Sequence, residues 1–282
     1  MTLNQILAKA KRGRCAIGHF NASTFEQMKA IVDAAGITKQ PVMIGTSEGE
    51  LAYLGLQRTV ALFRQFRRDT KIPIFLNLDH SHSFDICKAA IDAGYDSVLF
   101  DGSRMSYEEN VRTTKRVRDY AKKIDKNISI EGEFGVLPTE SSKVYRTKIK
   151  VDPKQFTDPR RAHQFVSLTK VDRLAPSFGT LHGIQAGGVN PHIDLKRLRE
   201  IAAAVPKTYL VMHGGSGTPA GDVKKAIRAG IVNVHISTEI RLEYVKSLRR
   251  ELARDEYAPY KILGPVVQNM TKLIVAKIKS FR

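Results

Sequence analysis

The chain of 282 residues has only two cysteines, Cys15 and Cys87, and no apolar run that approaches the roughly 18 residues of a membrane span. Two cysteines cannot build a disulfide framework, so we expect a cytoplasmic protein with no membrane partner. Residues 1–14 lack the continuous apolar stretch of a secretory signal. Gly/Ser-rich linkers are also lacking, which predicts a single domain over residues 1–282.

Acidic residues are scarce relative to basic ones, since 28 Asp and Glu face 46 Lys and Arg, a formal net charge of +18. Such an excess attracts phosphates, nucleic acids or anionic surfaces and carries no information about the fold. The basic segment 107–124 has only Tyr107 and Tyr120 to stack on bases. We therefore do not favour nucleic acid or an acidic protein as the partner that explains the positive charge. A solvated basic surface is the simpler explanation.

Short apolar runs alternate with segments of helical periodicity along the whole chain. Eight runs lie at 15–21, 41–45, 73–79, 97–101, 128–133, 173–178, 209–213 and 232–236. Helices are predicted at 1–14, 25–35, 59–70, 83–93, 107–124, 159–169, 194–205, 219–229, 239–252 and 264–281. The runs are apolar on both faces, which is typical of strands covered by helices. The pattern predicts an α/β fold, a single-domain (β/α)₈ TIM barrel with a short N-terminal helix and a C-terminal helix.

Two segments are longer than a minimal unit requires. Residues 135–153 are polar, and residues 183–191 are rich in glycine. Both follow predicted strands, and the loops after strands form the active face of a barrel. They are candidate mobile lids or, alternatively, ordinary long surface loops.

Polar residues gather at the predicted strand ends, where a barrel carries its function. His80, His182 and His213 all fall there, and three imidazoles can bind zinc while leaving one position open for a substrate oxygen. Asp79 precedes His80 and could serve as a general acid or base, or could instead orient a histidine.

Glycine-rich turns follow the seventh and eighth predicted strands. One begins at His213 and reads His-Gly-Gly-Ser-Gly-Thr-Pro, and the other contains Thr238. Barrels often bind phosphate at these two turns, because backbone amides and helix N-termini there attract anions. Two ordinary tight turns are the alternative.

Eight short motifs follow one another along nearly the whole chain. They are Gly18-His19-Phe20-Asn21, Thr46-Ser47-Glu48-Gly49, Leu78-Asp79-His80, the stretch from Ala93 to Ser103, Glu131-Gly132-Glu133-Phe134-Gly135, Gly179-Thr180-Leu181-His182-Gly183, His213-Gly214-Gly215-Ser216-Gly217 and Ser237-Thr238-Glu239. In this order they resemble the class II, zinc-dependent fructose-bisphosphate and tagatose-bisphosphate aldolases.

The resemblance implies a homodimer or homotetramer that cleaves a phosphorylated ketose to dihydroxyacetone phosphate and an aldehyde. It implies a catalytic Zn²⁺ on the positions that match His80, His182 and His213, with Asp79 as the acid/base residue. This chemistry needs no lysine Schiff base, because a divalent metal stabilises the negative charge left by carbon–carbon cleavage.

Further site residues are implied by the same resemblance. Asp101 and Glu133 match carboxylates of a second, buried metal position in some members. A monovalent cation is implied near Gly183 and Gly214. The implied substrate contacts are Ser216 and Thr238 at the triose phosphate, and Asn21 and Ser47 at the far end.

Several residues differ from the family pattern at its substrate-binding positions. A lysine, an asparagine, an arginine and a glycine pair are replaced by Ala186, His235, Tyr260 and Pro138-Thr139 respectively. Each lost charge-assisted hydrogen bond is worth about 1.5–3 kcal/mol, so we expect a standard bisphosphate to bind poorly unless Arg241 or Arg104 compensates. His235 could donate a hydrogen bond to substrate or add a fourth metal ligand.

The residues thus favour a metal-dependent aldolase with altered specificity for a phosphorylated ketose. The alternative is a catalytically weak or inactive relative that serves as a binding or assembly module with a basic surface.

Overall fold

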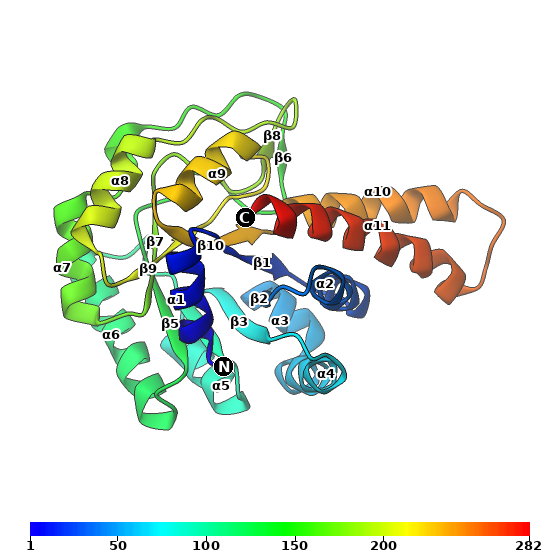
Figure 1. The fold of residues 1–282 in the computed structure, drawn as a ribbon, viewed down its shortest axis with the longest axis horizontal. Helices are drawn as coiled ribbons and strands as arrows, with labels where there is room; N and C mark the ends of the chain where they lie inside the picture. The colour runs from blue at the N-terminus through cyan, green and yellow to red at the C-terminus, as the bar shows by residue number, and fades with distance from the viewer.

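A closed barrel of eight parallel strands, ringed by helices, forms the body of the protein in a computed structural model that describes residues 1–282 (Figure 1). Neighbouring strands follow the order β1-β10-β9-β7-β5-β4-β3-β2. Their bounds are β1 Ile17–Asn21, β2 Val42–Ser47, β3 Ile74–Ser81, β4 Ser97–Phe100, β5 Ser129–Phe134, β7 Arg173–Pro176, β9 Tyr209–Met212 and β10 Ile231–Ile236. The predicted (β/α)₈ barrel is confirmed.

Eleven α-helices accompany the strands. They are α1 Leu3–Gly13, α2 Phe25–Thr38, α3 Glu48–Leu54, α4 Leu56–Asp69, α5 Phe84–Ala93, α6 Tyr107–Ile124, α7 Pro159–Thr169, α8 Leu195–Ala204, α9 Ala220–Arg228, α10 Thr238–Leu252 and α11 Pro259–Ser280. Local sequence sets several starts, because Thr2, Ser47 and Ser106 each form a capping box with the residue three positions on. None of the helices has both the length and the apolar character of a membrane span.

Three features differ from the sequence prediction. Helix α3 was not expected, and the two long loops contain the short strands β6 (Val144–Tyr145) and β8 (Ile184–Gln185), which pair with each other. Helix α11 begins at Pro259 and continues through Pro265, whereas a start at 264 was predicted. Pro at the first position of a helix is favourable, and packing of Val266 and Met270 in the core sustains the helix past Pro265. With α10 it forms an antiparallel pair that extends beyond the ring (Figure 1).

The barrel interior changes from apolar to polar along its axis. Helix α1 lies across one end (Figure 1), and its Leu3, Ile6 and Leu7 pack with Met43 and Phe75 from the strands. Because side chains alternate along a strand, the next inward positions of β3 after Phe75 are Asn77 and Asp79. The polar layers therefore lie beneath the carboxyl ends of the strands, where the active face is expected.

Candidate active site

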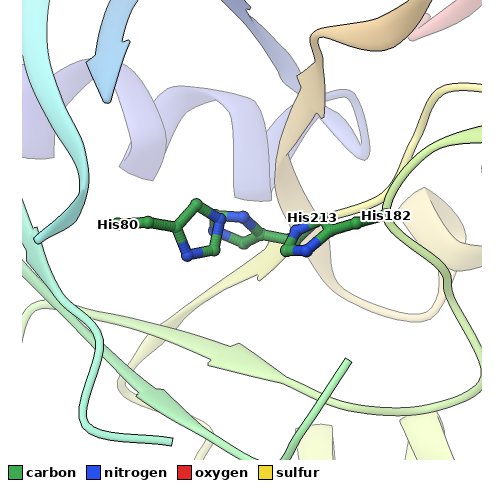
Figure 2. Close-up of side chains that lie close together, drawn as sticks. All are labelled: His80, His182 and His213. Atoms are coloured by element: carbon green, nitrogen blue, oxygen red, sulfur yellow. The ribbon is translucent and has the colours of Figure 1, made fainter. Parts of the chain in front are cut away.

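Three histidines converge at the carboxyl ends of three different strands. His80 lies near the end of β3 with a positive φ of 47°, His213 directly follows β9, and His182 lies in the loop after β7. Figure 2 shows the three rings gathered at one point. Ring centroids are 4.6 Å apart for His80 and His213, 4.8 Å for His80 and His182, and 6.0 Å for His182 and His213. The structure thus brings together side chains that are up to 133 residues apart (213 − 80).

Carboxylates fix the orientation of two of these rings. Nδ1 of His80 lies 3.0 Å from Asp101 Oδ2 and 3.2 Å from Glu133 Oε2. Nε2 of His213 lies 2.8 Å from Glu131 Oε1. Each of these contacts engages one ring nitrogen and leaves the other for a ligand, which is the usual arrangement around metal-binding histidines.

Burial and mutual repulsion disfavour a proton on His182, whereas neighbouring carboxylates favour one on His80. Burial, followed by the nearby His80 and His213, lowers the pKa of His182 to about 3. Burial also lowers the pKa of His80, but Asp79 and Glu133 outweigh it and raise that pKa well above its ordinary value. Since His80 Nδ1 bonds to Asp101, Glu133 Oε2 is close to that nitrogen but accepts no hydrogen bond. Three imidazoles beside unsatisfied carboxylate oxygen fit a divalent metal ion, whose charge would replace the missing protons.

Other groups of donors come close together, but their geometry suits a metal less well. His19, Asp79 and His235 form one such group, and Glu131, His213 and His235 form another. The rings of His19 and His235 stack 3.6 Å apart with an interplanar angle of 9°. One ion cannot lie in both ring planes, as the imidazole lone pairs require. Glu131 is already committed to the buried Arg173, whose NH1 lies 2.6 Å from Glu131 Oε2.

Asp79 lies beside the histidine cluster in a buried position. Its Oδ2 accepts a hydrogen bond from Asn21 at 2.9 Å, and its Oδ1 has no hydrogen-bond partner, with His235 Nδ1 3.4 Å away. Burial raises the pKa of Asp79, but His80 and then His235 outweigh this effect and lower it well below the ordinary value. The carboxylate is therefore ionised and has one oxygen free to accept a proton.

The turns after β9 and β10 form a second polar region of the site. Ser216 Oγ accepts from the backbone N–H groups of Ser237 at 3.2 Å and Glu239 at 3.3 Å, which joins the two turns. Ser237 Oγ is buried without a partner, and α10 begins at Thr238. Gly214 has a φ of +69°. A helix N-terminus, an unpartnered hydroxyl and a glycine-rich turn together favour an anion.

One cavity of about 420 Å³ contains every site residue expected from the sequence. These lining residues are Asn21, Ser47, Asp79, His80, Asp101, Glu133, His182, Gly183, His213, Gly214, Ser216, His235, Thr238 and Arg241. His235 stacks on His19 and does not join the group formed by His80, His182 and His213. Arg241 NH2 contacts Glu50 Oε1 at 2.5 Å.

Sequence reasoning missed four residues that shape the cavity from behind. Glu50, Glu131 and His19 support Arg241, His213 and His235 respectively, and Arg173 supports Glu131. A signal for Arg173 was present, because a charged residue that begins a strand covered on both faces requires a partner if it is buried. The alternation of β5 also places Glu131 on the same face as Glu133.

Comparison with known proteins gives a consistent set of similarities. The family described as fructose-bisphosphate aldolase class-II matches residues 1–282. The fructose-bisphosphate aldolase of Geobacillus stearothermophilus is 34% identical over 289 residues, which cover 100% of this chain and 96% of that protein. The fructose-bisphosphate aldolase of Staphylococcus aureus (strain COL) is 35% identical over 286 residues, with the same coverage.

Solved structures show the same likeness. The YdjI aldolase of Escherichia coli K12 superposes with a TM-score of 0.85 at 25% identity, and the match covers 99% of this chain and 96% of that one. A putative fructose-1,6-biphosphate aldolase from Coccidioides immitis gives a TM-score of 0.84 at 27% identity, again with 99% and 96% coverage.

Proposed function

The chain belongs to the class II fructose-bisphosphate aldolase family, and from that premise we propose that this carbon–carbon lyase cleaves a phosphorylated ketose to dihydroxyacetone phosphate and an aldehyde. The observation that carries the proposal is the convergence of His80, His182 and His213 beside an ionised Asp79 within one cavity. Metal dependence follows from the family and from this donor set.

We propose Zn²⁺ as the metal, held by His80, His182 and His213. A divalent ion bound there supplies Lewis-acid stabilisation for the negative charge that cleavage leaves on the dihydroxyacetone phosphate fragment. Glu131 and the pair of Asp101 and Glu133 hold the rings of His213 and His80 from behind. Asp101 and Glu133 are also the candidates for a second metal position.

Asp79 is the proposed base of the cleavage direction. The free Oδ1 of Asp79 takes the proton of a substrate hydroxyl group. The carbon that carries this hydroxyl becomes the aldehyde carbonyl, and the bond between that carbon and the dihydroxyacetone phosphate fragment breaks. The electron pair of the broken bond stays on the dihydroxyacetone phosphate fragment. In the condensation direction the same oxygen returns the proton. Asn21 orients the carboxylate through its bond to Oδ2.

The phosphate of the dihydroxyacetone half is proposed to bind between the turns after β9 and β10. Gly214, Ser216, Ser237 and Thr238 line the cavity there. The N-terminus of α10 favours negative charge, which compensates in part for the lysine that Ala186 replaces. A monovalent cation held by backbone near Gly183 and Gly214 stays a prediction, as do a homo-oligomer and a cytoplasmic location.

The test is a cleavage assay on phosphorylated ketoses before and after chelation. We expect dihydroxyacetone phosphate to be released, release to stop with chelator and to return with Zn²⁺. A His213→Ala variant should be inactive, whereas His163→Ala, which changes an exposed histidine of α7 outside the cavity, should retain activity. Turnover that survives chelation, or equal turnover in both variants, would contradict the proposal.

A non-catalytic binding module, the alternative interpretation of the sequence, is not favoured. The family and the similar curated proteins are enzymes by name, and the donor set and the acid/base carboxylate are both in place here.

A further inference from the structure

We infer that Glu50 makes this site selective for an aldehyde partner that carries hydroxyl groups and no phosphate, so that the preferred ketose has a single phosphate. The inference rests on the proposed function and deepens it. Its basis is a buried carboxylate behind the cavity wall, which engages Asn21 and Arg241 in the part of the cavity where a second phosphate would need free donors.

Glu50 lies in the first turn of α3 and is only 7% exposed. Its Oε2 accepts from the backbone N–H of Ser47 at 2.8 Å and from Asn21 Nδ2 at 3.1 Å. Its Oε1 accepts from Arg241 NH2 at 2.5 Å. A single buried carboxylate therefore collects three donors that come from β1, β2 and α10.

These contacts leave no free hydrogen on the Asn21 amide or on the Ser47 backbone N–H, which lie on the β1 and β2 side of the cavity. The amide of Asn21 has two hydrogens, and both are donated to carboxylates, one to Glu50 and one to Asp79. The charge of Arg241 is neutralised by Glu50. A phosphate at this side of the cavity would have to compete with the Glu50 carboxylate for Arg241, which is costly for a partly buried pair.

The opposite side of the cavity keeps its donors free, which fixes the orientation of a substrate with one phosphate. Ser237 Oγ is buried without a partner at the N-terminus of α10. The nearby carboxylate of Glu239 is offset by Lys277, whose Nζ lies 2.5 Å from Glu239 Oε2. One side of the cavity thus attracts an anion, while on the other side the donors of Asn21 and Arg241 are already engaged by Glu50.

The remaining charges of the cavity wall do not restore a second anion site. Apart from Arg241, the only Lys or Arg side chain of the wall is Arg104, which is exposed in the loop after β4. Asp101, Glu133 and Glu140 also line the wall. A hydroxyl group suits the side of the cavity at Asn21 and Ser47 better than a phosphate does, because it needs no free positive charge and can donate to Ser47 Oγ.

The experiment compares two acceptors that differ by one phosphate group at the far end. The Zn²⁺-loaded enzyme condenses dihydroxyacetone phosphate with D-glyceraldehyde or with D-glyceraldehyde 3-phosphate, and kcat/KM is measured for each. Loss of one charged hydrogen bond corresponds to roughly tenfold or more in affinity, so we expect the uncharged acceptor to be preferred at least tenfold.

The variant Glu50→Gln removes the negative charge and releases Arg241. We expect it to raise the ratio of kcat/KM for the phosphorylated acceptor over the uncharged one by roughly tenfold. The matched control is Glu243→Gln, which makes the same charge change on α10, two residues from Arg241 and outside the cavity. It should leave the ratio unchanged.

The outcomes distinguish failure of the Glu50 inference from failure of the proposed aldolase function. Wild-type enzyme that prefers the phosphorylated acceptor, or accepts both equally, overturns the inference and leaves the proposed function intact, whether or not Glu50→Gln folds. An unchanged ratio in folded Glu50→Gln removes Glu50 as the determinant. Failure to condense either acceptor, with metal bound, overturns the proposed function and this inference with it.

Discussion

The substitution Glu131→Gln tests whether a buried ion pair supports the metal centre. Glu131 lies between Arg173 NH1 at 2.6 Å and His213 Nε2 at 2.8 Å, and all three side chains are buried. Gln retains the size of the side chain and an oxygen for His213. It removes the only carboxylate that pairs with the guanidinium of Arg173.

Two effects of known size follow from this geometry. Removing one partner of a buried ion pair costs about 3–5 kcal/mol, because the remaining charge is left without compensation. Arg173 keeps its hydrogen bonds to the neutral side chains of Asn77, Ser97, Ser129 and Asn233. These bonds cannot replace the negative charge of Glu131. Loss of a carboxylate behind a metal-binding histidine weakens metal affinity by about 10–100-fold.

The pH dependence gives the same pair a second signature. Burial raises the pKa of Glu131, but Arg173 and then His213 outweigh it and lower the pKa to about 2 from the ordinary 4.5. A lowered pKa means that the stabilisation is complete above pH 4.5 and is lost as the pH falls toward 2. The wild-type protein should lose this contribution on acidification, and Glu131→Gln should not.

Urea unfolding of the metal-free protein measures the first effect, and competition with a chelator for Zn²⁺ measures the second. The exposed Glu108→Gln on α6 is the matched control and should change stability by less than about 0.5 kcal/mol. If Glu131→Gln has the stability and the metal affinity of Glu108→Gln, the buried pair does not support the centre and the reasoning is refuted.

Three further substitutions or reactions probe other parts of the structure. His182→Ala removes one of three metal ligands, so isothermal titration should show Zn²⁺ affinity reduced by at least about tenfold; unchanged affinity would exclude this ligand. Cys87 is fully buried and burial raises its pKa to about 12, whereas Cys15 is partly exposed. A thiol reagent at pH 8 should therefore label Cys15 alone in the folded protein, and rapid labelling of two thiols would contradict the packing. Gly214→Ala forces a side chain into a backbone with φ of +69° and against Leu181 O, so we expect a loss of about 1–3 kcal/mol in stability and a higher KM for dihydroxyacetone phosphate; wild-type values for both would show that the turn can accept a side chain.

Much of the barrel could be predicted from the sequence because its signals are local. The segments 107–124 and 159–169 were predicted with the bounds that α6 and α7 have, since Ser106 and Asp158 cap these helices and Pro159 begins one. The predicted strand ends alone place the three histidines on one face of the barrel. That inference needed only the rule that parallel strands in a barrel end on the same side.

The polar interior could not be predicted, because it depends on pairing between distant segments. The register of β1 against β10 sets His19 opposite His235, and Gly45 leaves the space that the His19 ring fills. Arg173 read as the start of an apolar strand, while its partner Glu131 is 42 residues earlier (173 − 131). Likewise, nothing local to Arg241 indicates Glu50, since the two are joined only by closure of the barrel.

The most direct test is the position of a bound metal in crystals of the Zn²⁺-loaded protein, located by anomalous scattering. We expect one strong peak about 2.0–2.1 Å from a nitrogen of each of His80, His182 and His213. A peak between His19, Asp79 and His235 instead, or no peak at the three histidines, would contradict it.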